Sequence, residues 1–217
     1  YPISGHWTWG GGWLSQLGFH DFAGSSIVHS VGAWVGLAGA AIIGPRIGKF
    51  NDDGTSNVIR GHSVPMTIVG LMLIVVGFFG FLGACVLYGG TAQWVNIYGG
   101  PTTLSAICFN TLMGVAGGII GGSTKTRDPF WMMSGALCGI ISVASGLDLY
   151  YPGVTFVVAF IGGYLGPVFA GIIEKFKIDD GGSWVGIKAN DFGNGRRIKK
   201  GIVKTITTRH KTGSNGI

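Results

Sequence analysis

The chain has 217 residues, of which 47% are hydrophobic and only 11% charged, and its formal net charge is +6. A soluble domain carries about 25% charged residues, so this composition excludes an ordinary soluble globular protein. The 42 glycines follow no Gly-X-Y period, which excludes collagen, and they lie inside long apolar runs, as is common in membrane helices. The cysteines also lie in apolar runs and are expected to be packing residues: Cys85, Cys108 and Cys138.

Five uncharged apolar runs are candidates for membrane-spanning helices, each of which needs about 20 residues. In chain order they are residues 23–44, 64–88, 102–122, 129–147 and 153–173. Before them, residues 3–17 form an apolar stretch that is too short to span, and we expect an interfacial segment or the end of a helix whose beginning is absent. The pattern predicts an all-α membrane protein, a polytopic helical bundle, over residues 1–180.

The basic residues fall on one side of this predicted topology. All 15 Lys and Arg residues lie in residues 45–63, in residues 123–128 or after Glu174, whereas residues 1–22, 89–101 and 148–152 contain none. By the positive-inside rule, the side rich in basic residues is cytoplasmic.

From about Gly181 the sequence becomes polar and basic, and residues 181–217 are expected to form a disordered cytoplasmic tail. Such a tail can contact anionic lipid headgroups, but solvation and positive-inside charge are the favoured explanation. No nucleic-acid partner is expected.

Small residues recur at four-residue spacing within the predicted spans. Such spacing places them on one helix face and permits close contact between helices. The pairs are Gly32/Gly36, Gly117/Gly121, Gly118/Gly122, Gly135/Gly139 and Gly162/Gly166.

Two ionisable residues lie at or inside the first predicted span. Asp21 is at its outer mouth, and His29 follows eight residues later, so the two would lie within about 80° of each other around a helix. A neutral imidazole suits a buried position and can accept one hydrogen bond while donating another. This chemistry fits a small species that enters as a cation and loses a proton before it crosses the apolar barrier. The alternatives are a helix N-cap for Asp21 and a hydrogen bond to a neighbouring helix for His29.

Aromatic residues form two groups: Trp7, Trp9 and Trp13 on the outer side, and Phe78, Phe79 and Phe81 in the second predicted span. A ring face attracts an ammonium-type cation by about 0.5–2 kcal/mol. Interfacial tryptophans and phenylalanines that fill a membrane core are the ordinary explanation of both groups.

The segment DFAGSSIVHSVGAWVGLAGAAIIGPRIGKF, residues 21–50, resembles the signature of the ammonium transporter family (Amt/Mep, related to Rhesus proteins). The matching features are Asp followed by an aromatic residue, Ala and Gly, a His eight residues after the Asp, and a Gly-x-Arg exit. The resemblance continues in family order through HWTWGGGWLSQLG upstream and FFGFLGA, FNTLMGVAGG, SGALCGIIS and KIDD downstream. It covers about residues 5–180 and implies the fifth to ninth helices of an 11-helix inverted-repeat fold.

The resemblance implies roles for five residues. Asp21 would support the outer site that recruits ammonium, and the ring of Trp9 would offer cation–π contact there. Cys85 stands where family members often carry a serine that contacts the ion. Phe81 would be the second of two stacked phenylalanines that gate the pore, and His29 the first of two pore histidines that relay the proton.

The sequence also departs from the family pattern. Leu82 replaces a usual asparagine, and the Cys85 thiol is a weaker donor and acceptor than a hydroxyl. Counterparts of the first gate phenylalanine and the second pore histidine are absent, and the resemblance stops near Asp180.

These observations predict transport of ammonium or ammonia across a membrane by outer-site cation recruitment, deprotonation and conduction past His29. The alternatives are an ammonium sensor of the same fold and a truncated, non-conducting fragment. The expected partners are ammonium or ammonia, with methylammonium as a further substrate, the lipid bilayer and two further copies in a homotrimer. The expected location is the plasma membrane. Because no nucleophile or metal-binding motif accompanies Asp21 and His29, we expect no enzyme, no cofactor and no metal site.

Overall fold

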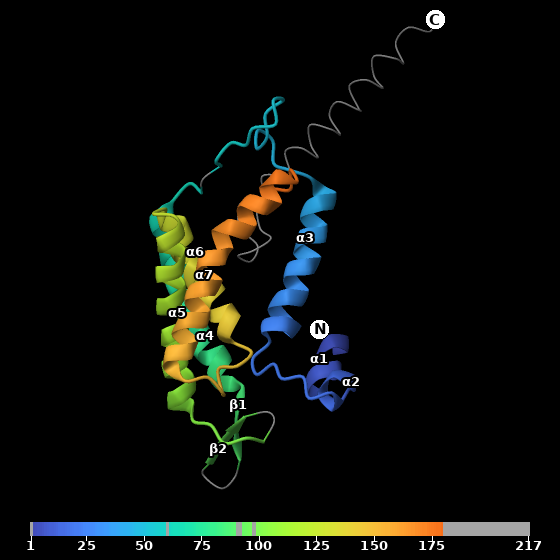
Figure 1. Cartoon of the computed structure of the whole chain (residues 1–217), viewed down its shortest axis with the longest axis vertical. Helices are drawn as coiled ribbons and strands as arrows, with labels where there is room; N and C mark the ends of the chain where they lie inside the picture. The colour runs from blue at the N-terminus through green and yellow to red at the C-terminus, as the bar shows by residue number, and fades with distance from the viewer. Residues whose placement is uncertain (1, 60, 90–92, 97–98, 180–217) are drawn as a thin grey trace, which may run out of the picture.

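The computed structural model describes residues 2–59, 61–89, 93–96 and 99–179. The expected tail, residues 181–217, lies outside this described part. Figure 1 shows a mainly helical chain, and its elements in order are α1 (Pro2–Trp9), α2 (Trp13–Gln16), the π-helix η1 (Ser25–Ser30), α3 (Val31–Ile43), α4 (Val64–Ala84), β1 (Val86–Gly89), β2 (Gln93–Asn96), α5 (Leu104–Lys125), α6 (Pro129–Val143) and α7 (Pro152–Lys175).

The expected helical bundle is confirmed, with two differences at the ends of helices. Within the described residues, four helical segments are long and apolar enough to cross a membrane, and α6 is a shorter apolar helix. The second expected span ends at Ala84 rather than Tyr88, because the following residues pair as the antiparallel hairpin β1–β2. The fourth ends at Val143 rather than Leu147, where the chain turns toward α7.

Local sequence signals explain where these helices begin. The Thr103 hydroxyl accepts a hydrogen bond from the backbone N–H of Ala106 and so caps α5. Asp128 caps α6 by accepting from the N–H of Phe130, and Pro129 occupies the first helical position, where no N–H is needed.

Helices α5, α6 and α7 form the packed core, and glycines set their close approach. A Cβ atom on Gly118 would collide with the carbonyl oxygen of Gly135 and lie 2.9 Å from the Cα of Gly139. From the third helix, a Cβ on Gly163 would collide with the carbonyl oxygen of Gly118. The predicted role of four-residue small-residue spacing in helix contact is confirmed for this core.

Helix α3 stands apart from that core (Figure 1). It has no buried residue, and a Cβ added to Gly32 or Gly36 would meet nothing within 4 Å in the described part of the chain. Large apolar side chains are exposed along it, including Trp34 at 70% and Ile42 at 86%. The contacts that hold α3 are therefore concentrated at its two ends.

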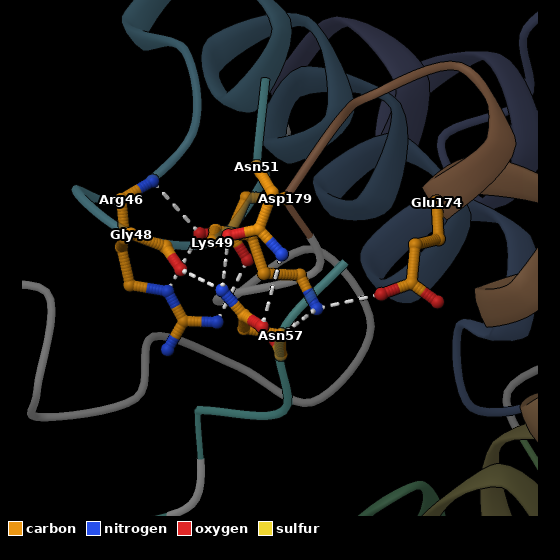
Figure 2. Close-up of polar contacts among 7 residues, drawn as sticks. All are labelled: Arg46, Gly48, Lys49, Asn51, Asn57, Glu174 and Asp179. Carbon is orange, nitrogen blue, oxygen red and sulfur yellow. Dashed lines mark hydrogen bonds and ion pairs between the residues drawn. The ribbon is translucent and has the colours of Figure 1, made fainter. Parts of the chain in front are cut away.

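At the C-terminal end of α3, a group of charged residues, here called the charged clasp, joins the following loop to the end of α7 (Figure 2). The guanidinium of Arg46 donates from Nε and Nη2 to the two carboxylate oxygens of Asp179 at 2.6 and 2.7 Å. The backbone N–H of Arg46 donates to the same carboxylate at 3.0 Å. The Nζ of Lys49, a residue that is only 6% exposed, lies 2.7 Å from Oε1 of Glu174. The bidentate geometry of the Arg46–Asp179 pair makes it both stronger and more directional than a single contact.

The opposite end of the bundle gathers the remaining segments. Figure 1 places α1, α2, the hairpin β1–β2 and the turn between α6 and α7 there, around the start of the helix that continues into α3. We call it the hairpin end. The residues that the sequence predicts for cation recruitment come from this end.

Candidate functional site

Asp21 caps the first helical turn at the hairpin end. Its side chain is fully buried. Its two carboxylate oxygens accept four backbone N–H bonds, from Gly24, Ser25, Ser26 and Ile27, at 2.9, 3.0, 2.8 and 3.1 Å. An ionised carboxylate has about four acceptor positions, and these bonds match that number. Asp21 thus satisfies the first N–H groups of the helix from three residues before the N-cap, which is Gly24, and these N–H dipoles compensate the buried charge.

The expectation that Asp21 and His29 share the face of one helix is wrong. Asp21 precedes the helix, and the first turn after it is the π-helix η1, which carries His29. Short π segments widen the turn and occur often at functional sites. The backbone N–H of His29 accordingly donates to the oxygen of Gly24, five residues earlier, at 3.1 Å.

Gly24 makes this turn possible. Its φ is +92°, a left-handed conformation that L side chains rarely adopt. An added Cβ would lie 2.6 Å from Cγ2 of Val28 and 3.4 Å from Cη2 of Trp9. Only glycine fits here, and its carbonyl oxygen accepts the backbone N–H groups of Val28 and His29 and also lies near the His29 ring.

The imidazole of His29 is held in one orientation. Its Nδ1 lies 3.1 Å from the carbonyl oxygen of Gly24. Because a carbonyl oxygen can only accept, Nδ1 is the donor, and in the neutral imidazole Nε2 then keeps its lone pair. The ring stacks on Phe78, with centroids 6.0 Å apart and planes 19° apart, and meets Phe81 edge-on at 6.3 Å.

Trp9 reaches the same group of residues from α1. Its indole Nε1 donates to the backbone oxygen of Asp21 at 2.7 Å. This bond fixes the ring beside the Asp21–Gly24 turn. Trp7 and Trp13, the other two tryptophans of the predicted outer group, lie against each other with ring centroids 5.9 Å apart.

Cys85 lies one turn beyond Phe81, at the end of α4. Its thiol donates to the backbone oxygen of Phe81 at 3.4 Å, within its own helix. Cys85 and Phe78 pack against a buried cluster that includes Phe22 and Leu82. Leu82 is fully buried in this apolar cluster, and an asparagine at that position would need a hydrogen-bond partner there.

These contacts connect Trp9, Asp21, Gly24 and His29 in series and end on Phe78 and Phe81. We call this series the contact chain. The sequence profile described as the Ammonium Transporter Family matches residues 1–187. The chain belongs to the ammonium transporter family.

Several members of this family resemble the chain closely. The ammonium transporter Amt1 of Methanocaldococcus jannaschii is 39% identical over 184 residues, which are 83% of this chain and 44% of that protein. The ammonium transporter Amt2 of Haloferax mediterranei is 36% identical over 83% of this chain and 41% of its own length. The chain thus spans less than half the length of these relatives.

Solved structures of family members have the same fold. A structure described as a sensor Amt protein is 32% identical, with a TM-score of 0.74 over 85% of this chain and 46% of that chain. Mep2 of Candida albicans is 23% identical and matches with a TM-score of 0.64, which supports the fold alone. The chain is a multi-pass membrane protein of the all-helical ammonium transporter fold.

Four of the five residues with roles implied by the family lie on the contact chain: Trp9, Asp21, His29 and Phe81. The fifth, Cys85, is connected to it through the backbone of Phe81. Sequence reasoning gave no role to Gly24, and it named Phe78 only as one of three phenylalanines in the second predicted span. Gly24 was visible as the Gly of the DFAG motif, and Phe78 as part of the FFGF run, but neither pattern states which ring or carbonyl faces the histidine. Among the described residues no group of three or more His, Cys, Asp or Glu could hold a metal ion.

Proposed function

We propose that this protein transports ammonium or ammonia across a membrane by cation recruitment at the hairpin end, deprotonation, and conduction past His29. The observation that supports it is the contact chain from Trp9 to His29 and the two phenylalanines, in a member of the ammonium transporter family. Recruitment, deprotonation and conduction each use one part of the contact chain.

Recruitment takes place beside Trp9 and Asp21. The face of an indole attracts an ammonium-type cation by about 0.5–2 kcal/mol. Because the Asp21 carboxylate already accepts four N–H bonds, it acts through its negative charge and by shaping the turn rather than as a direct ligand. Cys85 contributes a weak contact at most, since its thiol donates to Phe81.

Deprotonation lowers the barrier to crossing. A charged group in the centre of a bilayer costs several kcal/mol, whereas neutral ammonia avoids most of that cost. His29 presents Nε2 as an acceptor, because Nδ1 is engaged with Gly24. This lone pair receives a hydrogen bond from ammonia or accepts the released proton. Phe81 contributes its ring to the gate next to the imidazole, and Phe78 packs against both rings.

The wider setting follows from the same proposal. Methylammonium is a second substrate, because its ammonium group offers the same cation chemistry. The functional unit is a homotrimer in the plasma membrane, and the ends rich in Lys and Arg, with the C-terminal tail, face the cytoplasm.

A second candidate function is ammonium sensing. The structural match to a sensor Amt protein, at 32% identity and a TM-score of 0.74, favours it. A sensor would bind the cation at Trp9 and Asp21 without net movement across the membrane. A non-conducting portion of a transporter is the third reading, since the chain spans less than half the length of its relatives.

Uptake and binding of labelled methylammonium, measured in parallel on the full chain in lipid vesicles, separate these readings. For transport we expect saturable uptake that is reduced in Trp9→Ala and in Asp21→Asn. The matched controls are Trp13→Ala, which alters an exposed tryptophan of the same region, and Asp53→Asn, which alters an acid in the loop beyond α3. Binding without uptake would favour a sensor or a non-conducting portion, and absence of both would contradict the proposal.

A further inference from the structure

Residues 20–25, the segment that contains Asp21, run antiparallel to residues 141–148, at the end of α6 and the turn after it. Four contacts join the two segments at near-regular spacing, and we call them the Asp21 seam. In the middle, the backbone N–H groups of Phe22 and Ala23 donate to the carbonyl oxygens of Ser145 and Ala144 at 2.9 and 3.0 Å. At one end, Nε2 of His20 lies 3.0 Å from Oδ1 of Asp148. At the other end, the Ser25 hydroxyl donates to the carbonyl oxygen of Ile141 at 2.5 Å.

The contact between His20 and Asp148 is the charged end of the seam. The Asp148 side chain is 0% exposed, and that of His20 is 28% exposed. A buried carboxylate must be paired, because burial without a partner costs far more than the pair gains. An ionised carboxylate only accepts, so Nε2 of His20 donates the hydrogen. The pair therefore requires a side chain that places an N–H at the Nε2 position.

The second segment of the seam, residues 141–148, is fixed to the packed core. The side-chain amide of Asn110, on α5, donates to the backbone oxygens of Leu147 and Tyr150 at 2.9 and 2.8 Å. Asn110 is itself buried. The turn that carries Asp148 is thus anchored in the bundle. Phe22 and Ala23 of the facing segment are buried against the same core, whereas α3 itself has no buried residue. The seam therefore ties the backbone on both sides of Asp21 to the core.

Asp21 lies between two rungs of this seam. Its backbone oxygen accepts the indole N–H of Trp9, and its carboxylate starts the turn that leads to His29. A shift of residue 20 would move both groups at once. We propose that His20 and Asp148 are positioning residues for the cation site formed by Trp9 and Asp21. The expected effect on methylammonium binding rests on the proposed function. The expected effect on the backbone around Asp21 rests only on the contacts of the seam.

The test uses the full chain in lipid nanodiscs, with methylammonium as the probe and two measurements. The first is methylammonium affinity from tryptophan fluorescence. The second is hydrogen–deuterium exchange of the peptide that contains the amides of Phe22 and Ala23. The variants are His20→Ala, which removes the donor, and His20→Gln, whose amide nitrogen reaches the Nε2 position. His62→Ala is the matched control, because His62 is an exposed histidine beyond α3.

We expect His20→Ala to weaken methylammonium binding by at least about tenfold, the low end of the effect of losing one charge-assisted hydrogen bond, and to speed exchange in the Phe22–Ala23 peptide. His20→Gln restores both values to within about twofold, and His62→Ala changes neither. The single variant Asp148→Ala is measured as well, and the double variant His20→Ala/Asp148→Ala should bind no more weakly than the worse single variant, since both single changes break the His20–Asp148 contact.

Two results would overturn the inference: unchanged exchange in His20→Ala, or a His20→Gln variant no better than His20→Ala. If wild-type protein does not bind methylammonium, the proposed function fails, and the exchange data alone decide whether the pair positions Asp21.

Discussion

The Nδ1 atom of His29 and the backbone oxygen of Gly24 lie 3.1 Å apart, which fixes the orientation and the tautomer of the imidazole together. The bond is local, between the first residue of a π turn and the sixth. The π geometry brings the histidine back over the oxygen, and the positive φ of Gly24 leaves room for the turn. The acceptor character of Nε2 therefore follows from the backbone.

This relationship predicts the tautomer of His29. In a full chain labelled with ¹⁵N at histidine, we expect the signals of the neutral form of His29 to be those of the tautomer with hydrogen on Nδ1. Assignment comes from the spectrum of His29→Gln, in which these signals disappear. A signal pattern with hydrogen on Nε2 would show that the Gly24 contact does not hold the ring in the membrane.

The charged clasp predicts a large and pair-specific effect on stability. Arg46→Gln leaves the Asp179 carboxylate, which is 6% exposed, without its bidentate partner. We expect the free energy of unfolding to fall by about 2–4 kcal/mol, because the buried carboxylate keeps the backbone N–H of residue 46 but loses its cationic partner. Thermal unfolding in detergent measures this change.

Two controls test the clasp. Asp53→Asn alters an exposed acid in the same loop and should shift stability by less than about 0.5 kcal/mol. The swapped pair Arg46→Asp/Asp179→Arg should recover part of the loss. Equal stability of Arg46→Gln and wild type would mean that the clasp contributes nothing to holding the end of α3.

The glycine contacts predict a contrast between two helices. Gly118→Ala places a methyl group against the backbone of Gly135, so we expect a loss of about 1–3 kcal/mol or more from overpacking. Gly36→Ala on α3 meets nothing within 4 Å in the described residues. It should change stability by no more than about 1 kcal/mol, the usual difference in helix propensity. Similar losses for both would indicate that α3 is packed as tightly as α5 in the membrane.

Hydropathy predicted the bounds of the helices well where capping residues, prolines or charges mark the helix ends in the sequence. The spans that became α5 and α7 begin and end within three residues of their expected bounds, because caps, prolines and charges mark them in the sequence. The end of α4 was misplaced because the residues after Ala84 are as apolar as the helix before them. Nothing in their hydropathy indicates the hairpin.

The site was predictable in its residues but not in its connections. The family resemblance pointed to Trp9, Asp21 and His29, yet the π turn and the four N–H bonds to Asp21 depend on backbone geometry that residue types do not specify. The pairs Arg46–Asp179 and His20–Asp148 join residues 133 and 128 positions apart. Pairings over such separations arise from the packing of whole helices, so a reading of local pattern in one sequence does not contain them.

In the proposed mechanism an ammonium-type substrate crosses the membrane past His29. The most direct test of this mechanism is the initial rate of labelled methylammonium uptake into vesicles that contain the full chain, compared with His29→Ala and with His62→Ala as the matched histidine control. We expect saturable uptake in the wild type, at least a tenfold lower rate in His29→Ala, and an unchanged rate in His62→Ala. Wild-type uptake that persists at full rate in His29→Ala would contradict the account.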